Sequence, residues 1–188
     1  RERTQVFPLI FGGGPSAVNP EPLASFMDFY LIGDGEQSLP HVMEIIADFK
    51  REHAHEDLIA LDAAALEKLR YDLLVKIAKE VPGVYVPFLY EVTSNAPYPV
   101  PKIEGIPDRV KRQTVALSDE NQPTQGLVPY LALVHDREVL EVRRGCDRGC
   151  RFCQPGYTFL PVRERSTEDL LRLSKDALNH SGNDEYSL

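Results

Sequence analysis

The prolines of this chain constrain its fold most strongly, because seven of the 15 lie between residues 84 and 130. Proline lacks a backbone N–H and clashes with the preceding helical turn, so no long helix can cross this stretch. Short β-like runs remain at residues 84–86 and 89–93, and the aromatic residues among them indicate packing against folded parts. We therefore predict an extended, irregular connector that wraps over its neighbouring domains.

The segment before the connector alternates short apolar strands with helices. Residues 6–11 and 29–32 are compact apolar runs that each end in a glycine-rich turn, and a short helix is expected at 23–27. Apolar residues at helical spacing predict two longer helices, at about 40–53 and 62–80. This order of elements is typical of an open α/β sheet with parallel strands.

The segment after the connector has the pattern of a strand, a loop and a helix. A strand is expected at residues 139–143 and a helix at 167–180, with Ser166 as its N-cap and Gly182 as its stop. Residues 185–188 have the pattern of the start of the next strand. We predict the first β/α unit of a barrel, in which sites lie at the carboxyl ends of the strands.

The loop of this unit carries Cys146, Cys150 and Cys153, which are the only cysteines in the chain. Their spacing is C-x3-C-x2-C, and three thiolates on one short loop can bind three irons of a 4Fe-4S cube. The fourth iron would then be open to an outside ligand. Gly145 and Gly149 permit the backbone to curl around such a cluster.

Positive charge surrounds the cysteines, because residues 143–165 contain six arginines and two acidic residues. These arginines could form ion pairs on a solvated loop, offset the negative charge of a cluster, or receive an anionic ligand. Arg144, Arg148 and Arg151 are placed to favour the thiolate form of the cysteines.

Two other uses of the cysteines stay open. A zinc-stabilised interaction domain would need a fourth protein ligand, and His135 is the one histidine that lies close upstream. An iron–sulfur electron-transfer module would also need a fourth ligand, from His135 or from a partner. A disulfide would leave one cysteine over and would close a very small ring.

The cysteine motif has Phe152 before its last cysteine and a glycine before each of the first two, and it resembles the signature of the radical S-adenosylmethionine (SAM) superfamily. The resemblance implies that Cys146, Cys150 and Cys153 bind a 4Fe-4S cluster whose open iron chelates SAM. A donor such as flavodoxin or ferredoxin would supply the electron that cleaves SAM and starts radical chemistry on an unknown substrate. Phe152 is expected beside the adenine of SAM.

The wider run at 143–165 resembles the Fe-S oxidoreductase-like branch of that superfamily, which carries a cobalamin-binding-like domain ahead of the radical SAM barrel. By this resemblance Gly12, Gly13, Gly33 and Gly35 would line a pocket for the nucleotide tail of cobalamin. Neither glycine segment is a dinucleotide fingerprint or a P-loop. The cobalt-ligating pattern Asp-x-His-x-x-Gly is absent from the sequence, and two sharp turns are the alternative interpretation.

These patterns predict three parts. Residues 1–58 are expected to be the C-terminal part of a cobalamin-binding-like α/β domain, residues 59–136 a helix with the proline-rich connector, and residues 137–188 the start of a radical SAM barrel. Because this includes the first barrel unit alone, we expect an internal fragment of a larger enzyme that is inactive by itself.

Composition and charge indicate which partners and which cellular compartment to expect. The net charge of −8 argues against a surface that coats nucleic acid, although an RNA or protein substrate stays open. No apolar run is as long as a membrane span, so no membrane partner is expected. Free cysteines without an export signal predict a cytoplasmic enzyme.

Overall fold

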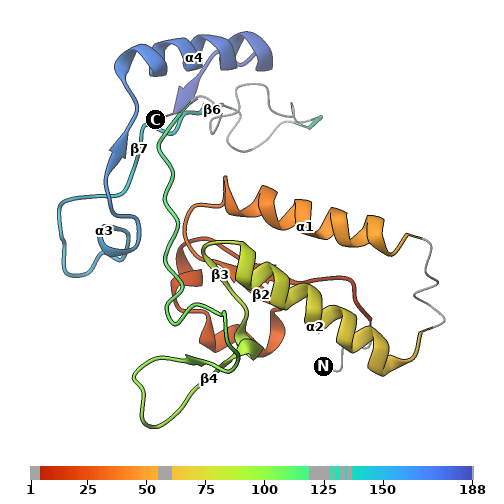
Figure 1. Ribbon diagram of the computed structural model, residues 1–188. Helices are drawn as coiled ribbons and strands as arrows, with labels where there is room; N and C mark the ends of the chain where they lie inside the picture. Colours follow the sequence, from red (N-terminus) through yellow and green to blue (C-terminus); the bar gives the residue numbers. More distant parts are fainter. Residues whose placement is uncertain are drawn as a thin grey trace. The chain divides into compact units, whose positions relative to one another are not determined.

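The computed structural model describes residues 5–54, 61–118, 128, 130, 131, 134 and 137–187. The chain divides into two compact units, Arg1–Val115 and Ala116–Leu188. In Figure 1 the first unit runs from red to green and the second from green to blue. The boundaries expected at residues 58 and 136 lie inside these units, and most of the described connector belongs to the first unit.

The first unit contains a three-stranded sheet in the order β1-β2-β3. Strand β1 (Phe11–Gly12) is parallel to β2 (Phe29–Leu31), which confirms the predicted parallel pair. Strand β3 (Val84–Tyr85) is antiparallel to β2, so the sheet is mixed. Of the strand expected at residues 6–11, only Phe11 lies in a regular strand. The Ile10 amide donates to the Asp28 carboxylate, at 2.6 Å, rather than to a strand partner.

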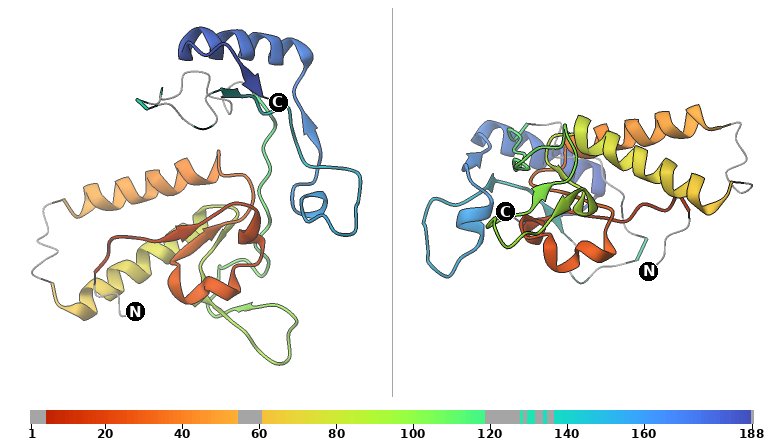
Figure 2. Two further views of the ribbon diagram at one scale, coloured as in Figure 1. Left: turned by 180° about the vertical axis from the view of Figure 1, so that it is seen from behind. Right: turned by 60° about the horizontal axis from the view of Figure 1, so that its bottom comes forward.

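Two long helices pack against each other in the first unit (Figures 1 and 2). Helix α1 spans Ser38–Glu52 and α2 spans Ala63–Glu80, close to the predicted ranges. Asp62 caps α2, because its side chain accepts a hydrogen bond from the Ala65 amide at 2.8 Å. The apolar faces of both helices and strand β2 form the core; its fully buried members include Phe29, Val42, Leu73, Leu74 and Ile77.

The short helix expected at residues 23–27 is instead a 3-10 segment, η2 (Glu21–Phe26), and another 3-10 segment, η1 (Pro15–Val18), precedes it. Each begins with a proline at one of its first two positions, and η2 buries none of its residues. So short a segment gains too few hydrogen bonds and too little packing to form a regular α-helix.

The connector folds onto the first unit. It forms η3 (Pro87–Leu89) and a small hairpin of β4 (Tyr90–Glu91) with β5 (Val100–Pro101). Gln113 then pairs with Gly33 beyond the end of β2: the Gln113 amide donates to the Ile32 carbonyl oxygen at 2.9 Å, and the Gln113 carbonyl oxygen accepts from the Asp34 amide at 3.0 Å. The prediction that the connector packs on a neighbouring domain is confirmed for its described residues up to Val115.

The second unit joins two parallel strands through a helix. Strand β6 (Glu138–Val139) is parallel to β9 (Tyr186–Ser187), and α4 (Thr167–Ser181) lies between them in the chain. The caps of α4 are as predicted, with the Ser166 hydroxyl accepting from the Asp169 amide at 3.0 Å and Gly182 at a φ of 76°.

A second strand pair branches from this unit. Strands β7 (Arg143–Arg144) and β8 (Arg163–Glu164) are antiparallel, and they enclose the cysteine loop and the short helix α3 (Pro155–Thr158). The single strand expected at 139–143 is therefore divided between β6 and β7. The strand is divided because its backbone changes hydrogen-bonding partner: the Leu140 amide donates to the Ser187 carbonyl oxygen, whereas the Val142 carbonyl oxygen accepts from the Arg165 amide. Among the described helices, none is both long and apolar enough to cross a bilayer.

Candidate metal centre

Gly145 fixes the direction in which the chain leaves β7 and starts the cysteine loop. Its φ is 85°, a conformation that residues with a side chain rarely adopt. A Cβ atom at this position would lie 2.5 Å from the Phe159 carbonyl oxygen and 3.0 Å from the Pro161 carbonyl oxygen. Only glycine fits here, which agrees with the curl expected from the sequence.

The three thiols lie on one loop and are all free. Cys150 is exposed, and Cys146 and Cys153 are half-buried. The Cys153 amide donates to the Cys150 carbonyl oxygen at 3.0 Å. These two cysteines therefore stand at the ends of a single turn, with their Cα atoms within about 7 Å. The backbone thus brings two of the three cysteines close together, and Cys146 follows Gly145 at the start of the loop.

The thiols do not yet converge. Within the part of the chain that the structure describes, no three side chains of cysteine, histidine, aspartate or glutamate are arranged to hold a metal ion. The histidine considered as a fourth ligand, His135, lies outside the described residues. The donor set itself suits an iron–sulfur cluster, because three free thiols on a short accessible loop are the soft ligands that such clusters take.

The backbone of the loop folds over the first turn of α3. Gly156 is buried, and a Cβ atom on it would lie 3.7 Å from the Cys146 carbonyl oxygen and 3.9 Å from the Gly149 amide nitrogen. The Tyr157 hydroxyl donates to the Gly149 carbonyl oxygen at 3.4 Å. Gly149 has a φ of 60° and open space around it, so its role is conformational. These contacts all lie within the segment between β7 and β8.

Four of the six arginines around the cysteines have partners of their own. Arg144 donates to both oxygens of Glu141, at 2.6 and 3.0 Å. Arg143 lies 3.3 Å from Glu164 and 3.7 Å from Asp147. The charge of Arg144 is therefore already paired with Glu141, and its expected effect on the thiolates stays a prediction.

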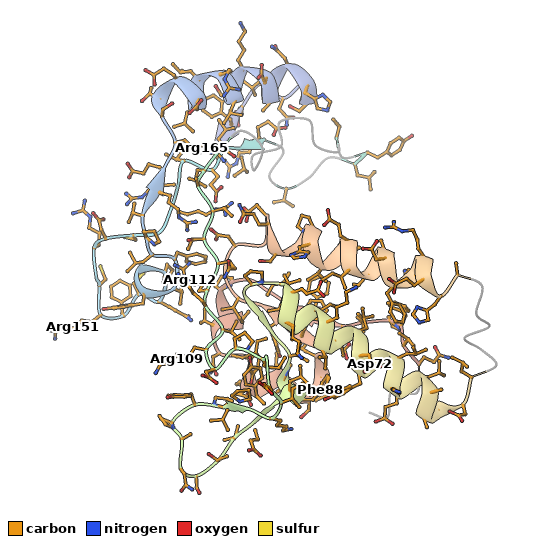
Figure 3. All side chains as sticks on the ribbon, in the orientation of Figure 1. Asp72, Phe88, Arg109, Arg112, Arg151 and Arg165 are labelled. Atoms are coloured by element: carbon orange, nitrogen blue, oxygen red, sulfur yellow. The ribbon has the colours of Figure 1, made fainter. Side chains whose placement is uncertain are left out.

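Arg148 and Arg151 are the two exceptions. Both are exposed on the cysteine loop, and neither forms a hydrogen bond or an ion pair with any residue that the structure describes. Figure 3 shows the Arg151 side chain extending outward from the loop. They are the cations of this segment that stay available to a cluster or an anion.

Arg165 organises the base of the loop and was not singled out from the sequence. Its side chain is 1% exposed, and it donates to the carbonyl oxygens of Glu141 at 3.0 Å and Ser118 at 2.8 Å (Figure 3). It also lies 3.9 Å from the Glu141 carboxylate. Because these partners are far apart in the sequence, no local pattern could have identified them.

The aromatic residues of the loop face solvent. Phe152 is 92% exposed and Tyr157 is 62% exposed. A phenylalanine with so little protein around it is free to pack against a bound molecule. The role expected for Phe152 beside the adenine of SAM stays a prediction.

The glycines expected to line a cobalamin pocket have different surroundings. A Cβ atom on Gly33 would lie 2.2 Å from the Gln113 carbonyl oxygen, so the connector occupies the space beside it. Gly12 lies against the Tyr30 ring, because a Cβ atom added to Gly12 would lie 2.8 Å from that ring. Gly13 approaches only the Leu31 carbonyl, at 3.8 Å, and Gly35 has open space around it. Gly12 and Gly33 are thus explained by close packing within the protein.

Comparison with known proteins finds a family model that matches the N-terminal part of the chain. Residues 1–87 match the family model described as "Radical SAM proteins, N-terminal". No curated protein and no solved structure matches the chain. The matched residues lie in the first unit and do not include the cysteine loop, so the family model and the C-x3-C-x2-C motif are separate observations that agree. Residues 1–87 are thus similar to the N-terminal region of radical SAM proteins.

Proposed function

We propose that this chain is part of a radical SAM enzyme in which Cys146, Cys150 and Cys153 hold a 4Fe-4S cluster and leave one iron open to SAM. The observation that carries the proposal is the set of three free thiols on one glycine-flanked loop, in a chain whose residues 1–87 match the radical SAM N-terminal family model. When bound, the cluster supplies an electron to SAM, whose cleavage starts radical chemistry on the substrate.

The loop would have to close when it takes up the cluster. Metal ligands must be deprotonated and brought together, and binding energy commonly supplies the cost of that ordering. The backbone turn from Cys150 to Cys153 supports this, because it brings the Cα atoms of two of the cysteines close together. The remaining movement belongs to Cys146, whose direction is set by Gly145.

The loop arginines that have no partner among the described residues would stabilise the negative charge of the cluster. A cluster with three thiolates carries net negative charge, and arginines nearby stabilise it. Arg148 and Arg151 supply that charge, because Arg143 and Arg144 have acidic partners. Phe152, exposed between the last two cysteines, would pack against the adenine of SAM.

A soluble one-electron donor such as flavodoxin or ferredoxin would reduce the cluster. Cobalamin is not part of the proposal, because the backbone of Gln113 lies against Gly33 and Tyr30 lies against Gly12. A small molecule, an RNA and a protein all stay open as the substrate.

Anaerobic reconstitution with iron and sulfide tests the proposal. We expect about four irons and four sulfides per chain, together with an electron-paramagnetic-resonance signal that changes when SAM is added. The triple Cys146→Ser, Cys150→Ser, Cys153→Ser variant should take up neither. Asp147→Asn is the matched control, since it changes the same loop and keeps all three thiols.

The alternatives predict different results. An electron-transfer module would take up a cluster whose signal is indifferent to SAM. A zinc-stabilised domain would be isolated with zinc and would contain no iron or sulfide. Either result would overturn the proposed enzyme function.

A further inference from the structure

A cavity of about 600 Å³ lies in the first unit, away from the cysteines in the sequence. Ile32, directly after β2, and Val18, in the segment that follows β1, both line it. The carboxyl ends of parallel strands are where open α/β sheets bind ligands, and this volume suits a small molecule. None of the four glycines considered for a cobalamin pocket lines this cavity.

Tyrosine rings form much of the wall. Tyr85 and Tyr90 are buried, and their ring centroids lie 4.6 Å apart with an angle of 33° between the planes. Tyr98, from the β4–β5 hairpin, is half-exposed and lines the same cavity. The face of a tyrosine ring carries negative electrostatic potential, which attracts cations.

The charged groups of the cavity are mostly acidic. Glu21 accepts a hydrogen bond from the Tyr85 hydroxyl. Asp108 is exposed, and it forms no hydrogen bond or ion pair with any described residue. Burial, and after it the charge of Asp108, raises the pKa of Tyr90 to about 12. The site therefore disfavours additional negative charge.

One cationic side chain of the protein already lies on the Tyr98 ring of this cavity. The Arg109 guanidinium lies 5.0 Å from the centroid of the Tyr98 ring. Figure 3 labels Arg109 on the connector segment that follows the β4–β5 hairpin. Arg109 is exposed and has no ion pair with Glu21 or Asp108, so it covers the ring without neutralising either carboxylate.

We propose that this cavity binds an organic ammonium ion, such as a protonated or methylated amine. Tyr85, Tyr90 and Tyr98 surround the cationic head, and Glu21 and Asp108 supply the opposite charge. Arg109 is a resident cation that the ligand displaces from Tyr98. Aromatic rings around the cation are how proteins recognise quaternary ammonium groups.

The test titrates the full chain with choline and with spermidine, and it needs no cluster. Proton NMR of choline reports a ring environment directly, because aromatic faces move the N-methyl signal upfield. We expect a saturable upfield shift that weakens with salt. Tyr98→Ala should raise Kd by about 2- to 5-fold, as for a partly exposed cation–π contact. Tyr71→Ala is the matched control, since Tyr71 is a half-exposed tyrosine that does not line this cavity.

Arg109→Ala separates this proposal from its main rival. If the cavity binds cations, removal of the resident guanidinium frees the Tyr98 face and lowers the Kd for choline. If it binds anions, Arg109 is the anchor, and the wild-type chain binds inorganic pyrophosphate while Arg109→Ala does not. Binding of pyrophosphate lost in Arg109→Ala, or no saturable binding of either choline or spermidine, would overturn the proposal.

Discussion

Asp28 and Arg70 form an ion pair at 2.5 Å in which the side chains are only 7% and 9% exposed. Arg70 also donates to the carbonyl oxygens of Gln5 at 2.7 Å and Val6 at 2.9 Å. The other Asp28 oxygen accepts from the Ile10 amide. One buried pair therefore ties the start of the described chain, the residue before β2, and helix α2 together.

Removing one partner of this pair should be costly. Arg70→Ala leaves the Asp28 carboxylate buried without its countercharge, which typically costs about 3–5 kcal/mol of unfolding free energy. Urea denaturation of the full chain measures this change. Arg51→Ala is the control, because Arg51 pairs with Asp48 on the exposed face of α1 and should change stability by less than about 1 kcal/mol. Equal losses in the two variants would contradict the role assigned to Arg70.

Gly145→Ala should reduce cluster uptake. The added methyl group collides with the Phe159 carbonyl oxygen and also forces a positive φ on a residue with a side chain, so the direction of Cys146 changes. We expect a lower iron and sulfide content after anaerobic reconstitution. Gly149→Asn is the matched control, because asparagine tolerates a positive φ and nothing lies within 4 Å of the added atom. Full iron loading of Gly145→Ala would show that this position does not control the loop.

The sequence predicted the long helices well because their signals are local. Apolar residues recur at helical spacing in α1, α2 and α4, and Asp62, Ser166 and Gly182 mark helix ends within one residue. The cysteine loop was also found locally, since its motif spans eight residues. The parallel partners β1 and β2 followed from the strand–helix–strand order.

The features missed by the sequence depend on contacts between distant residues. Strand β3 is antiparallel to β2 because the chain returns from α2 through a turn at Gly83, whose φ is 81°. Arg165 contacts Ser118, which is 47 positions away, and Glu141, which is 24 positions away. The tyrosine-lined cavity likewise combines η2, β3 and the β4–β5 hairpin. Periodicity and capping carry no information about such pairings.

The cap of α4 should be visible in the titration of Asp169. The Ser166 hydroxyl, and after it the Arg172 guanidinium, hold the pKa of Asp169 below its ordinary value of 3.8. A lowered pKa means that the ionised carboxylate stabilises the fold above the ordinary value, and that this contribution is lost as the pH falls through the lowered pKa. Ser166→Ala should therefore raise the pKa of Asp169, as measured by carbon NMR of its carboxyl group.

The control for this titration is Ser174→Ala. Ser174 lies on the same helix, and its hydroxyl donates to the Leu171 carbonyl oxygen. It should leave the Asp169 titration unchanged. A Ser166→Ala variant with the wild-type Asp169 midpoint would contradict the assigned cause.

Alkaline stability should depend on Tyr90. Burial raises its pKa from 10.0 to about 12, and the nearby Asp108 carboxylate contributes less. Between these values the unfolded chain releases the Tyr90 proton and the folded chain retains it, so the free energy of unfolding falls as the pH rises through this window. Tyr90→Phe has no proton to release, so its unfolding free energy should fall less steeply between about pH 10 and 12.

Loss of the Tyr90 hydrogen bond to the Pro107 carbonyl lowers stability by the same amount at every pH below this window, so the slope is the informative quantity. Urea denaturation at a series of pH values gives that slope. Tyr71→Phe, a change at an exposed tyrosine outside the cavity, should keep the wild-type slope. If the curves of Tyr90→Phe and the wild-type chain run parallel, the buried phenol of Tyr90 does not retain its proton, and the role assigned to its burial is wrong.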